Sequence, residues 1–273
     1  YAINLVNEAS VEAGGPDNTA CTVEHPTLET SNIMMKHPAI QLIAATGGPG
    51  VVTAVLSSGR RGIGAGAGNP PAVVDETADL RKAAEDIVNG CTFDNNLPCI
   101  AEKEIVAVDS VVDELMNYMI TEQGCYLASK EEQDALTAVV LKGGKLNRKC
   151  VGRDAKTLLG MIGVTVPDNI RCITFEGPKE HPLIATELMM PILGVVRAKD
   201  FDDAVEQAVW LEHGNRHSAH IHSKNIDNIT KYAKAIDTAI LVKNGPSYAA
   251  LGFGGEGFCT FTIASRTGEG LTS

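Results

Sequence analysis

The sequence predicts an α/β fold with a parallel sheet. In the first and last thirds of the chain, short apolar runs suited to strands alternate with single segments suited to helices. The run Ile40–Ala45 is apolar and suits a buried parallel strand, and Ile192–Ala198 is a second expected strand. The 273 residues include only one Trp, five Tyr and six Phe, so the core must be largely aliphatic. Strands joined by single helices imply βαβ units and hence a parallel sheet.

The first third is expected to alternate helices and strands. Its first helix covers Tyr1–Ala13, where apolar residues recur at helical spacing, and it ends at Gly14-Gly15-Pro16. Thr27, just after Pro26, is the expected N-cap of the second helix. The elements that follow the first helix are a strand at Thr19–Val23, a helix at Thr27–Lys36, a strand at Ile40–Ala45, a helix at Val51–Ser57 and a strand at Arg61–Gly66.

The rest of the chain continues this pattern. The middle is expected to contain helices at Asp79–Gly90, Val111–Glu122 and Lys130–Leu141 around a strand at Glu104–Val108. The last third is expected to contain a strand at Ile192–Ala198, a helix from Asp200 to Gly214, a strand at Ser218–His222, a helix at Ile226–Ile236 and a strand at Ala239–Lys243.

Composition excludes several function classes. The formal charge is −11, from 23 basic and 34 acidic residues, which makes nucleic acid and anionic membranes poor partners. No apolar run reaches the roughly 18–20 residues of a membrane-spanning helix. The seven cysteines are widely spaced and contain no Cys-x-x-Cys pair. Their number and spacing favour reduced thiols in a reducing compartment over a disulfide framework or a zinc ribbon.

Cys99 is the first candidate for chemistry. It follows Pro98, which fixes the backbone before it, and the polar turn Asp94-Asn95-Asn96, whose amide groups could donate to an oxyanion. A thiol between a polar turn and an apolar strand is accessible but held, as a nucleophile requires. The alternative is a small hydrophobic residue packed in the core.

Three other motifs invite a functional interpretation. The turn Thr46-Gly47-Gly48-Pro49-Gly50 lies between a strand and a helix, which suits an anion, although a tight turn without a ligand is equally compatible. The histidines of His217–His222 could suggest a metal site. No acidic residue nearby completes one, so surface or half-buried strand histidines are favoured. Gly252–Gly257 is interpreted as a flexible loop, with close backbone approach to a ligand as the alternative.

Several separated runs resemble the aldehyde dehydrogenase superfamily, and most closely its CoA-acylating members of the propanediol- and ethanolamine-utilisation type. They occur in the order expected for that family and cover essentially the whole chain. The runs are ATGGPGVV (45–52), GIGAGAGNPPAVVDETAD (62–79), DNNLPCIAEKE (94–104), ELMMPILGVV (187–196), GFGGEG (252–257) and FTIASRTGEG (261–270).

The resemblance implies an activity. Cys99 corresponds to the family nucleophile, whose thiolate attacks an aldehyde, passes hydride to NAD and becomes a thioester. Hydrolytic members carry a Glu general base in a motif that falls on Gly64–Asn69, where this sequence has no carboxylate. The resemblance therefore implies that coenzyme A, rather than water, takes the acyl group. The expected reaction is the reversible oxidation of a short-chain aldehyde, propionaldehyde or acetaldehyde, to an acyl-CoA.

The resemblance also implies cofactor ligands. Glu187 matches a family Glu that contacts the ribose on the nicotinamide side, although Met189-Met190 replaces the usual Phe-Gly before Pro191. Thr46, Gly47, Gly48 and Gly50 match the turn beside the cofactor pyrophosphate, where backbone amides would bind phosphate. No metal is implied, and the family interpretation of His217–His222 is a structural strand.

The implied organisation is a fragment that lacks the N-terminal part of the family's chain. Residues 1–66 would be the later part of an NAD-binding domain, residues 67–250 the catalytic thiol domain, and residues 251–273 a C-terminal segment returning toward the cofactor or oligomerisation region. A homodimer or homotetramer is expected, in the cytoplasm or in the lumen of a bacterial microcompartment with its shell proteins as partners.

Two alternatives accompany this hypothesis. The first is a hydrolytic NAD(P)-dependent aldehyde dehydrogenase, which would release a free acid. The second is a fragment without activity that acts only as a binding or scaffold piece, because the family's Asn oxyanion donor and adenine-ribose site would lie before Tyr1.

Overall fold

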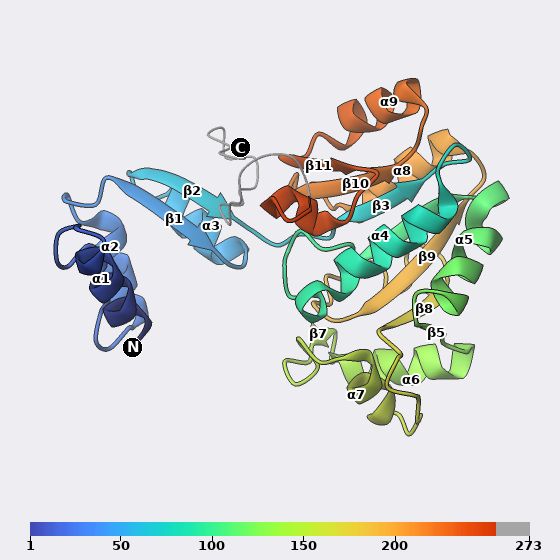
Figure 1. Cartoon of the computed structure of the whole chain (residues 1–273), viewed down its shortest axis with the longest axis horizontal. Helices are drawn as coiled ribbons and strands as arrows, with labels where there is room; N and C mark the ends of the chain where they lie inside the picture. The colour runs from blue at the N-terminus through green and yellow to red at the C-terminus, as the bar shows by residue number, and fades with distance from the viewer. Residues whose placement is uncertain (255–273) are drawn as a thin grey trace.

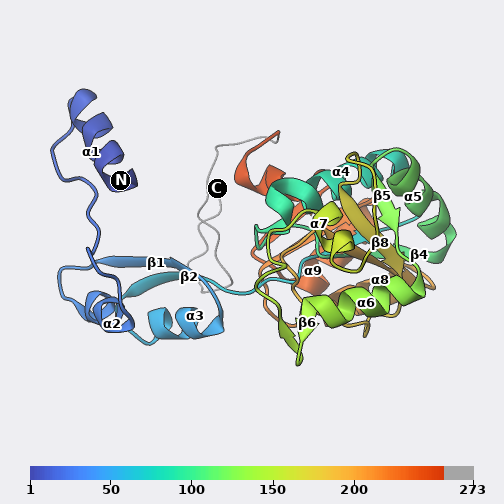
Figure 2. The ribbon, with the colours of Figure 1, turned by 90° about the horizontal axis from the view of Figure 1, so that it is seen from below.

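A computed structural model describes residues 1–254, which form a smaller and a larger unit (Figure 1). The smaller unit contains α1 (Ala2–Glu12), α2 (Leu28–Lys36), β1 (Leu42–Thr46), α3 (Pro49–Leu56) and β2 (Arg61–Ala65). Its two strands pair in parallel, with Thr46 opposite Ala65. Figure 2 shows the two units from a second direction. A single segment of chain runs from β2 to the larger unit.

The larger unit is built on a seven-stranded sheet in the order β11-β10-β3-β4-β9-β8-β5. Every neighbouring pair in this sheet is parallel, which confirms the predicted fold class. The strands are β3 (Pro71–Val74), β4 (Glu104–Val108), β5 (Cys125–Leu127), β8 (Cys172–Glu176), β9 (Ile192–Ala198), β10 (Ser218–His222) and β11 (Ile240–Lys243).

Helices cover both faces of this sheet. The chain moves across the sheet in one direction through α4 (Leu80–Thr92) and α5 (Asp109–Thr121), and back through α8 (Phe201–Leu211) and α9 (Ile226–Ile236). Because crossovers between parallel strands are right-handed, the two helix pairs lie on opposite faces. The other elements are η1 (Phe93–Asn96), α6 (Lys130–Val140), a short hairpin of β6 (Leu141–Lys142) and β7 (Lys145–Leu146), α7 (Ala155–Gly160) and η2 (Ser247–Leu251). Among the described residues, no helix is both long and apolar enough to cross a membrane.

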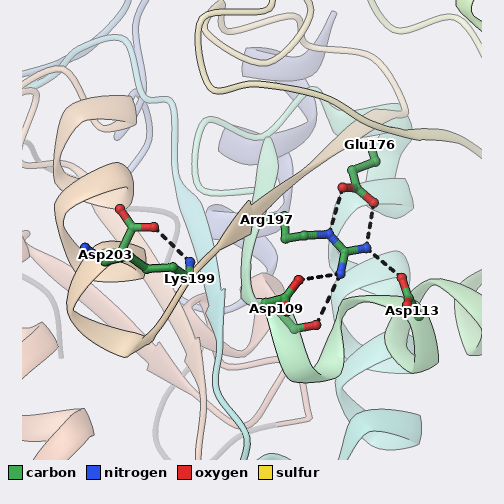
Figure 3. Close-up of polar contacts among 6 residues, drawn as sticks. All are labelled: Asp109, Asp113, Glu176, Arg197, Lys199 and Asp203. Atoms are coloured by element: carbon green, nitrogen blue, oxygen red, sulfur yellow. Dashed lines mark hydrogen bonds and ion pairs between the residues drawn. The ribbon is translucent and has the colours of Figure 1, made fainter.

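The two edges of the large sheet have different characters. At the carboxyl edge, Arg197 at the end of β9 binds Glu176 of β8 and both Asp109 and Asp113 of α5, through N–O distances of 2.6–2.9 Å (Figure 3). Beside it, the backbone N–H of Lys199 donates to the Asp203 carboxylate at 2.9 Å, at the start of α8. The ion pairs fasten the start of α5 to the sheet, and the Lys199 hydrogen bond caps the start of α8. The amino edge faces the smaller unit.

The core is aliphatic, as predicted. All residues of β3 and β4 are buried, and the largest fully buried side chains are mainly Ile and Leu. Five helices begin with the N-cap side chains that helix capping favours. Each of these side chains accepts a backbone N–H group of the first turn of its own helix; the residues are Asp79, Ser129, Asp154, Asp200 and Asn225.

One predicted strand is wrong. The segment Thr19–Val23 forms turns and irregular structure. The side chain of Asn7 takes the place of a strand partner: its amide donates to the carbonyl of Ala20 and its oxygen accepts the N–H of Ala20, both at 2.9 Å. This pairing closes the turn onto α1. In the large sheet, β3, β5 and β8 are not predicted by the sequence analysis, and neither is the short hairpin of β6 and β7.

Candidate active site

A cleft of about 870 Å³ opens where the two units meet. One wall is the carboxyl end of the small sheet, with Thr46 at the end of β1 and Gly47 and Gly48 after it. The other wall comes from segments that lead into β4 and β9, and it carries Cys99 and Glu187. Residues far apart in sequence therefore meet at one site, as the resemblance implies.

Five of the six predicted site residues line this cleft, and Gly50 does not. Gly50 lies in the first turn of α3 and is exposed. A Cβ atom placed on Gly48 or Gly50 would meet no atom within 4 Å, so the surface of this turn is open. The N-cap Gly48 places the start of α3 at the cleft wall. The cofactor roles of these residues remain predictions.

The turn before Cys99 has an unusual backbone. Asp94, Asn95 and Asn96 follow one another in the left-handed region, with φ values of 48°, 50° and 65°. Such a conformation costs roughly 1 kcal/mol for each non-glycine residue, and Asn and Asp tolerate it best. Tertiary contacts must therefore hold this turn, and it presents a half-buried Cys99 to the cleft.

The amide groups of this turn do not have the role that the sequence analysis assigned to them. The amide of Asn96 is buried and donates to the carbonyls of Cys91 and Glu102, both at 2.9 Å. The amide of Asn95 donates to the carbonyl of Gly152 at 3.1 Å. Both N–H groups of the Asn96 amide are therefore used within the fold, and neither Asn95 nor Asn96 lines the cleft.

Glu187 is held at the cleft by the segment that joins the two units. Its carboxylate accepts the N–H of Gly68 at 3.3 Å. A Cβ on Gly68 would lie 2.7 Å from the Cys99 carbonyl oxygen and 3.2 Å from Cγ of His217. Because only glycine fits there, Gly68 brings Cys99, Glu187 and His217 into one packed group.

Electrostatics at Cys99 reflects burial and two charged neighbours. Burial raises the pKa of the Cys99 thiol, the positive charge of Lys103 lowers it, and the negative charge of Glu187 raises it. Burial likewise raises the pKa of Glu187, while Lys103 and the Gly68 N–H oppose that shift. Lys103 is thus a charged group of the site that the sequence analysis missed. The feature of the sequence that could have indicated Lys103 is the run Glu-Lys-Glu at the start of β4, a strand whose residues are all buried.

The three histidines in and just before β10 are more deeply buried than predicted. His217, His220 and His222 are at most 2% exposed, because β10 lies inside the sheet between β11 and β3. Nε2 of His217 has no hydrogen-bond partner among the described residues. Burial lowers the pKa of His217 to about 4, so its imidazole is neutral at pH 7. Within residues 1–254, no group of three or more His, Cys, Asp or Glu side chains could hold a metal ion.

The apolar part of the cleft includes Phe93, Leu97, Met189 and Leu251. Met189 has a positive φ of 52°, and its carbonyl accepts the N–H of Gly152 at 2.9 Å. The motif 252–257 lies only partly within the described residues. The motif 261–270 and Cys259 lie outside them.

The profile of the aldehyde dehydrogenase family matches residues 2–141, about half of the chain. The chain belongs to the aldehyde dehydrogenase family. Two curated relatives match this chain along nearly all of its length. Acetaldehyde dehydrogenase (acetylating) EutE of Salmonella typhimurium is 49% identical, and the match covers 100% of this chain and 60% of EutE. Propanal dehydrogenase (CoA-propanoylating) of the same organism is 47% identical over 99% of this chain and 58% of its own length.

Solved structures agree with this assignment. A propionaldehyde dehydrogenase from the fucose-utilisation microcompartment of Clostridium phytofermentans has a TM-score of 0.96 and 77% identity, covering 100% of this chain and 62% of that one. A Rhodopseudomonas palustris propionaldehyde dehydrogenase, solved with bound CoA and an acylated cysteine, has a TM-score of 0.93 and 52% identity, covering 98% and 62%. This aldehyde dehydrogenase chain thus spans about 60% of the length of the relatives it matches.

Proposed function

We propose that the protein oxidises a short-chain aldehyde with NAD and transfers the acyl group to coenzyme A. One observation supports this most strongly: the cleft brings Cys99 opposite the Thr46–Gly48 turn, with Glu187 beside it. A nucleophile and a cofactor-binding turn must face one another for this chemistry. The relatives similar to this chain are acetylating or CoA-propanoylating enzymes, and one was solved with an acylated cysteine.

In the proposed reaction Cys99 acts twice. Its thiolate adds to the aldehyde carbon and forms a thiohemiacetal, and loss of hydride from that carbon leaves a thioester on Cys99. The thiol of coenzyme A then loses its proton and attacks the thioester carbonyl, and the Cys99 thiolate leaves. A thiol is acidic enough to act as the acceptor without the strong general base that water needs.

The residues present fit the nicotinamide cofactor. The open Gly48 surface and the start of α3 offer backbone amides and a positive helix end to phosphate groups, with Thr46 and Gly47 on the same wall. Glu187 on the opposite wall would accept hydroxyl groups of a ribose. NAD, when bound, supplies the hydride acceptor. The chain's own residues supply the nucleophile, its backbone N–H as an oxyanion donor, and the apolar wall for the aldehyde chain.

His217 is added to the site in this proposal. In the related C. phytofermentans enzyme, variants with a single histidine or a single cysteine replaced by alanine have been solved. The two replaced positions are separated by the same number of residues as Cys99 and His217. The imidazole is neutral at pH 7 and its Nε2 has no partner among residues 1–254, so His217 offers a proton acceptor, although a pKa of about 4 makes it a weak base that suits an acidic thiol better than water.

The alternative acceptor, water, would need one of the two carboxylates in the cleft, Asp94 or Glu187, as its base. Product analysis decides between the two acceptors. With propionaldehyde and NAD, NADH formation should require CoA and yield propionyl-CoA. Cys99→Ala should reduce the rate at least about 100-fold, because no other nucleophile replaces the thiolate. Equal NADH formation without CoA, together with free propionate, would contradict the proposal and favour hydrolysis.

We also propose that the protein works as a homo-oligomer in the lumen of a bacterial microcompartment, with shell proteins as partners. The support for this location is the similarity to an enzyme of a fucose-utilisation microcompartment. Co-purification with intact compartments, and release only when the shell is disrupted, would be the expected result.

A further inference from the structure

The amino group of Lys103 is buried beneath the cleft, and Lys103 is only 3% exposed. Its Nζ donates to the backbone carbonyl of Asn96 at 3.0 Å, to Oδ1 of Asn96 at 2.5 Å and to the carbonyl of Pro98 at 3.2 Å. An ammonium group has three N–H donors, so these three contacts satisfy it fully. All three acceptors belong to the segment that immediately precedes Cys99.

These contacts close the strained turn onto the start of β4. The left-handed residues Asp94–Asn96 need tertiary contacts to persist, and Lys103 supplies contacts at Asn96 and at Pro98. Asn96 is tied from the other side through its amide to Cys91 and Glu102. The backbone that places Cys99 is thus held between α4 and β4.

Hydrogen bonding alone does not require a charge at this position, because a neutral amide could bind two of the same acceptors. Burying an ammonium group costs free energy unless opposite charge is nearby. Two neighbouring carboxyl groups are poor counter-charges: burial raises the pKa of Glu102 to about 8 and raises that of Glu104 well above its usual range. Burial lowers the pKa of Lys103, and the groups that oppose this shift are Glu187 first, then Cys91, Cys99 and Glu104.

We propose that Lys103 is a positioning residue for the Cys99 nucleophile: its ammonium group fixes the turn that presents Cys99 and provides the positive charge that stabilises the thiolate. The proposal deepens the proposed function and rests on Cys99 being its nucleophile. Linkage makes the effect reciprocal, because a thiolate at Cys99 also stabilises the buried ammonium group. The negative charge of Glu187 raises the pKa of both groups, so it stabilises the Lys103 ammonium group and opposes the Cys99 thiolate.

The rate of Cys99 alkylation by iodoacetamide as a function of pH tests this role without turnover. The modified Cys99 peptide is quantified by mass spectrometry, so the other cysteines do not interfere. Lys103→Gln keeps two donors and removes the charge, and Lys103→Met removes both. We expect the midpoint of the alkylation profile to rise by about one pH unit in both variants. Lys103→Arg, which restores the charge, should return the midpoint toward the wild-type value.

Controls separate charge from stability and from the proposed function. Lys82→Gln removes a positive charge from the exposed side of α4 and should leave the Cys99 profile unchanged. An unchanged profile in folded Lys103→Gln, with only its thermal stability reduced, would overturn the electrostatic role. If Cys99→Ala retained full NADH formation, the proposed function would fail, while the effect of Lys103 on thiol reactivity would still be measured.

Discussion

Glu102 is a carboxyl group that the fold removes from water. It is fully buried, and one of its oxygens accepts the N–H of Ser247 at 2.9 Å. The other oxygen has no partner among the described residues. Gly90 makes room for this carboxyl group, since a Cβ there would lie within 2.1–2.5 Å of its atoms. Burial raises the pKa of Glu102 from 4.5 to about 8.

This shift predicts a pH-dependent loss of stability. The folded state keeps the Glu102 proton to a higher pH than the unfolded state does, so the free energy of unfolding falls as pH rises from about 4.5 to about 8. Between pH 6 and pH 9 the wild type should lose roughly 2–3 kcal/mol more than Glu102→Gln, which cannot ionise. Urea unfolding at both pH values measures this difference.

A matched substitution is available on the surface of α4, where Glu85 is exposed. Glu85→Gln should show the same pH dependence as the wild type, because it removes an exposed carboxyl group and leaves Glu102 in place. Parallel stability curves for Glu102→Gln and the wild type would show that the buried carboxyl group is not the source of the effect.

At the scale of elements, the segment between β2 and β3 packs through Gly68 against the cleft wall that carries Cys99 and Glu187. In Gly68→Ala, the new methyl group would collide with the Cys99 carbonyl, which belongs to a constrained backbone. We expect the free energy of unfolding to fall by about 1–3 kcal/mol and activity to fall with it. Thermal unfolding and the rate of NADH formation measure the two effects.

Gly160→Ala is the control for this substitution. Gly160 ends α7, is exposed, and a Cβ there would meet no atom within 4 Å. Alanine should be neutral or slightly stabilising at that position. A Gly68→Ala protein as stable and active as Gly160→Ala would disprove the tight packing described for the segment.

The Arg197 ion pairs stabilise the edge of the sheet away from the cleft (Figure 3). Arg197→Met keeps the apolar stem and removes the charge. Because the guanidinium group is partly exposed, we expect a loss of about 1 kcal/mol that shrinks with added salt, and unchanged aldehyde oxidation. Unfolding at low and at high salt tests this; a loss independent of salt would point to packing instead.

The elements also show which features sequence reasoning could reach. Long helices with capping residues, such as those beginning after Asp79 and Asp200, follow from periodicity and caps. β3 was missed because Pro71 suggests a loop, although proline is tolerated as the first residue of a strand. β5 has three residues, too few to show any period.

At the site too, residues within motifs could be predicted from the sequence, and residues whose burial depends on the tertiary fold could not. Cys99, Thr46 and Glu187 belong to recognisable motifs, so their proximity could be expected. Lys103 and His217 could not be placed, because a charged or imidazole side chain beside a strand is usually solvated. Only the surrounding sheet shows that both are buried.

At the scale of the whole molecule, the cleft is a product of two units. The smaller unit contributes the turn after β1, and the larger unit contributes the thiol and Glu187. Figure 1 shows that the units stand side by side and are joined by the segment after β2. The central claim is that a cysteine on one wall carries the acyl group from the aldehyde to coenzyme A.

A single-turnover experiment tests that claim most directly. The protein is mixed with propionaldehyde and NAD in the absence of CoA, digested, and searched by mass spectrometry for a propionyl group; CoA is then added to a second sample. The account predicts a propionyl thioester on the Cys99 peptide that disappears as propionyl-CoA forms. A propionyl group on another residue, or its release as propionate at the same rate without CoA, would contradict the account.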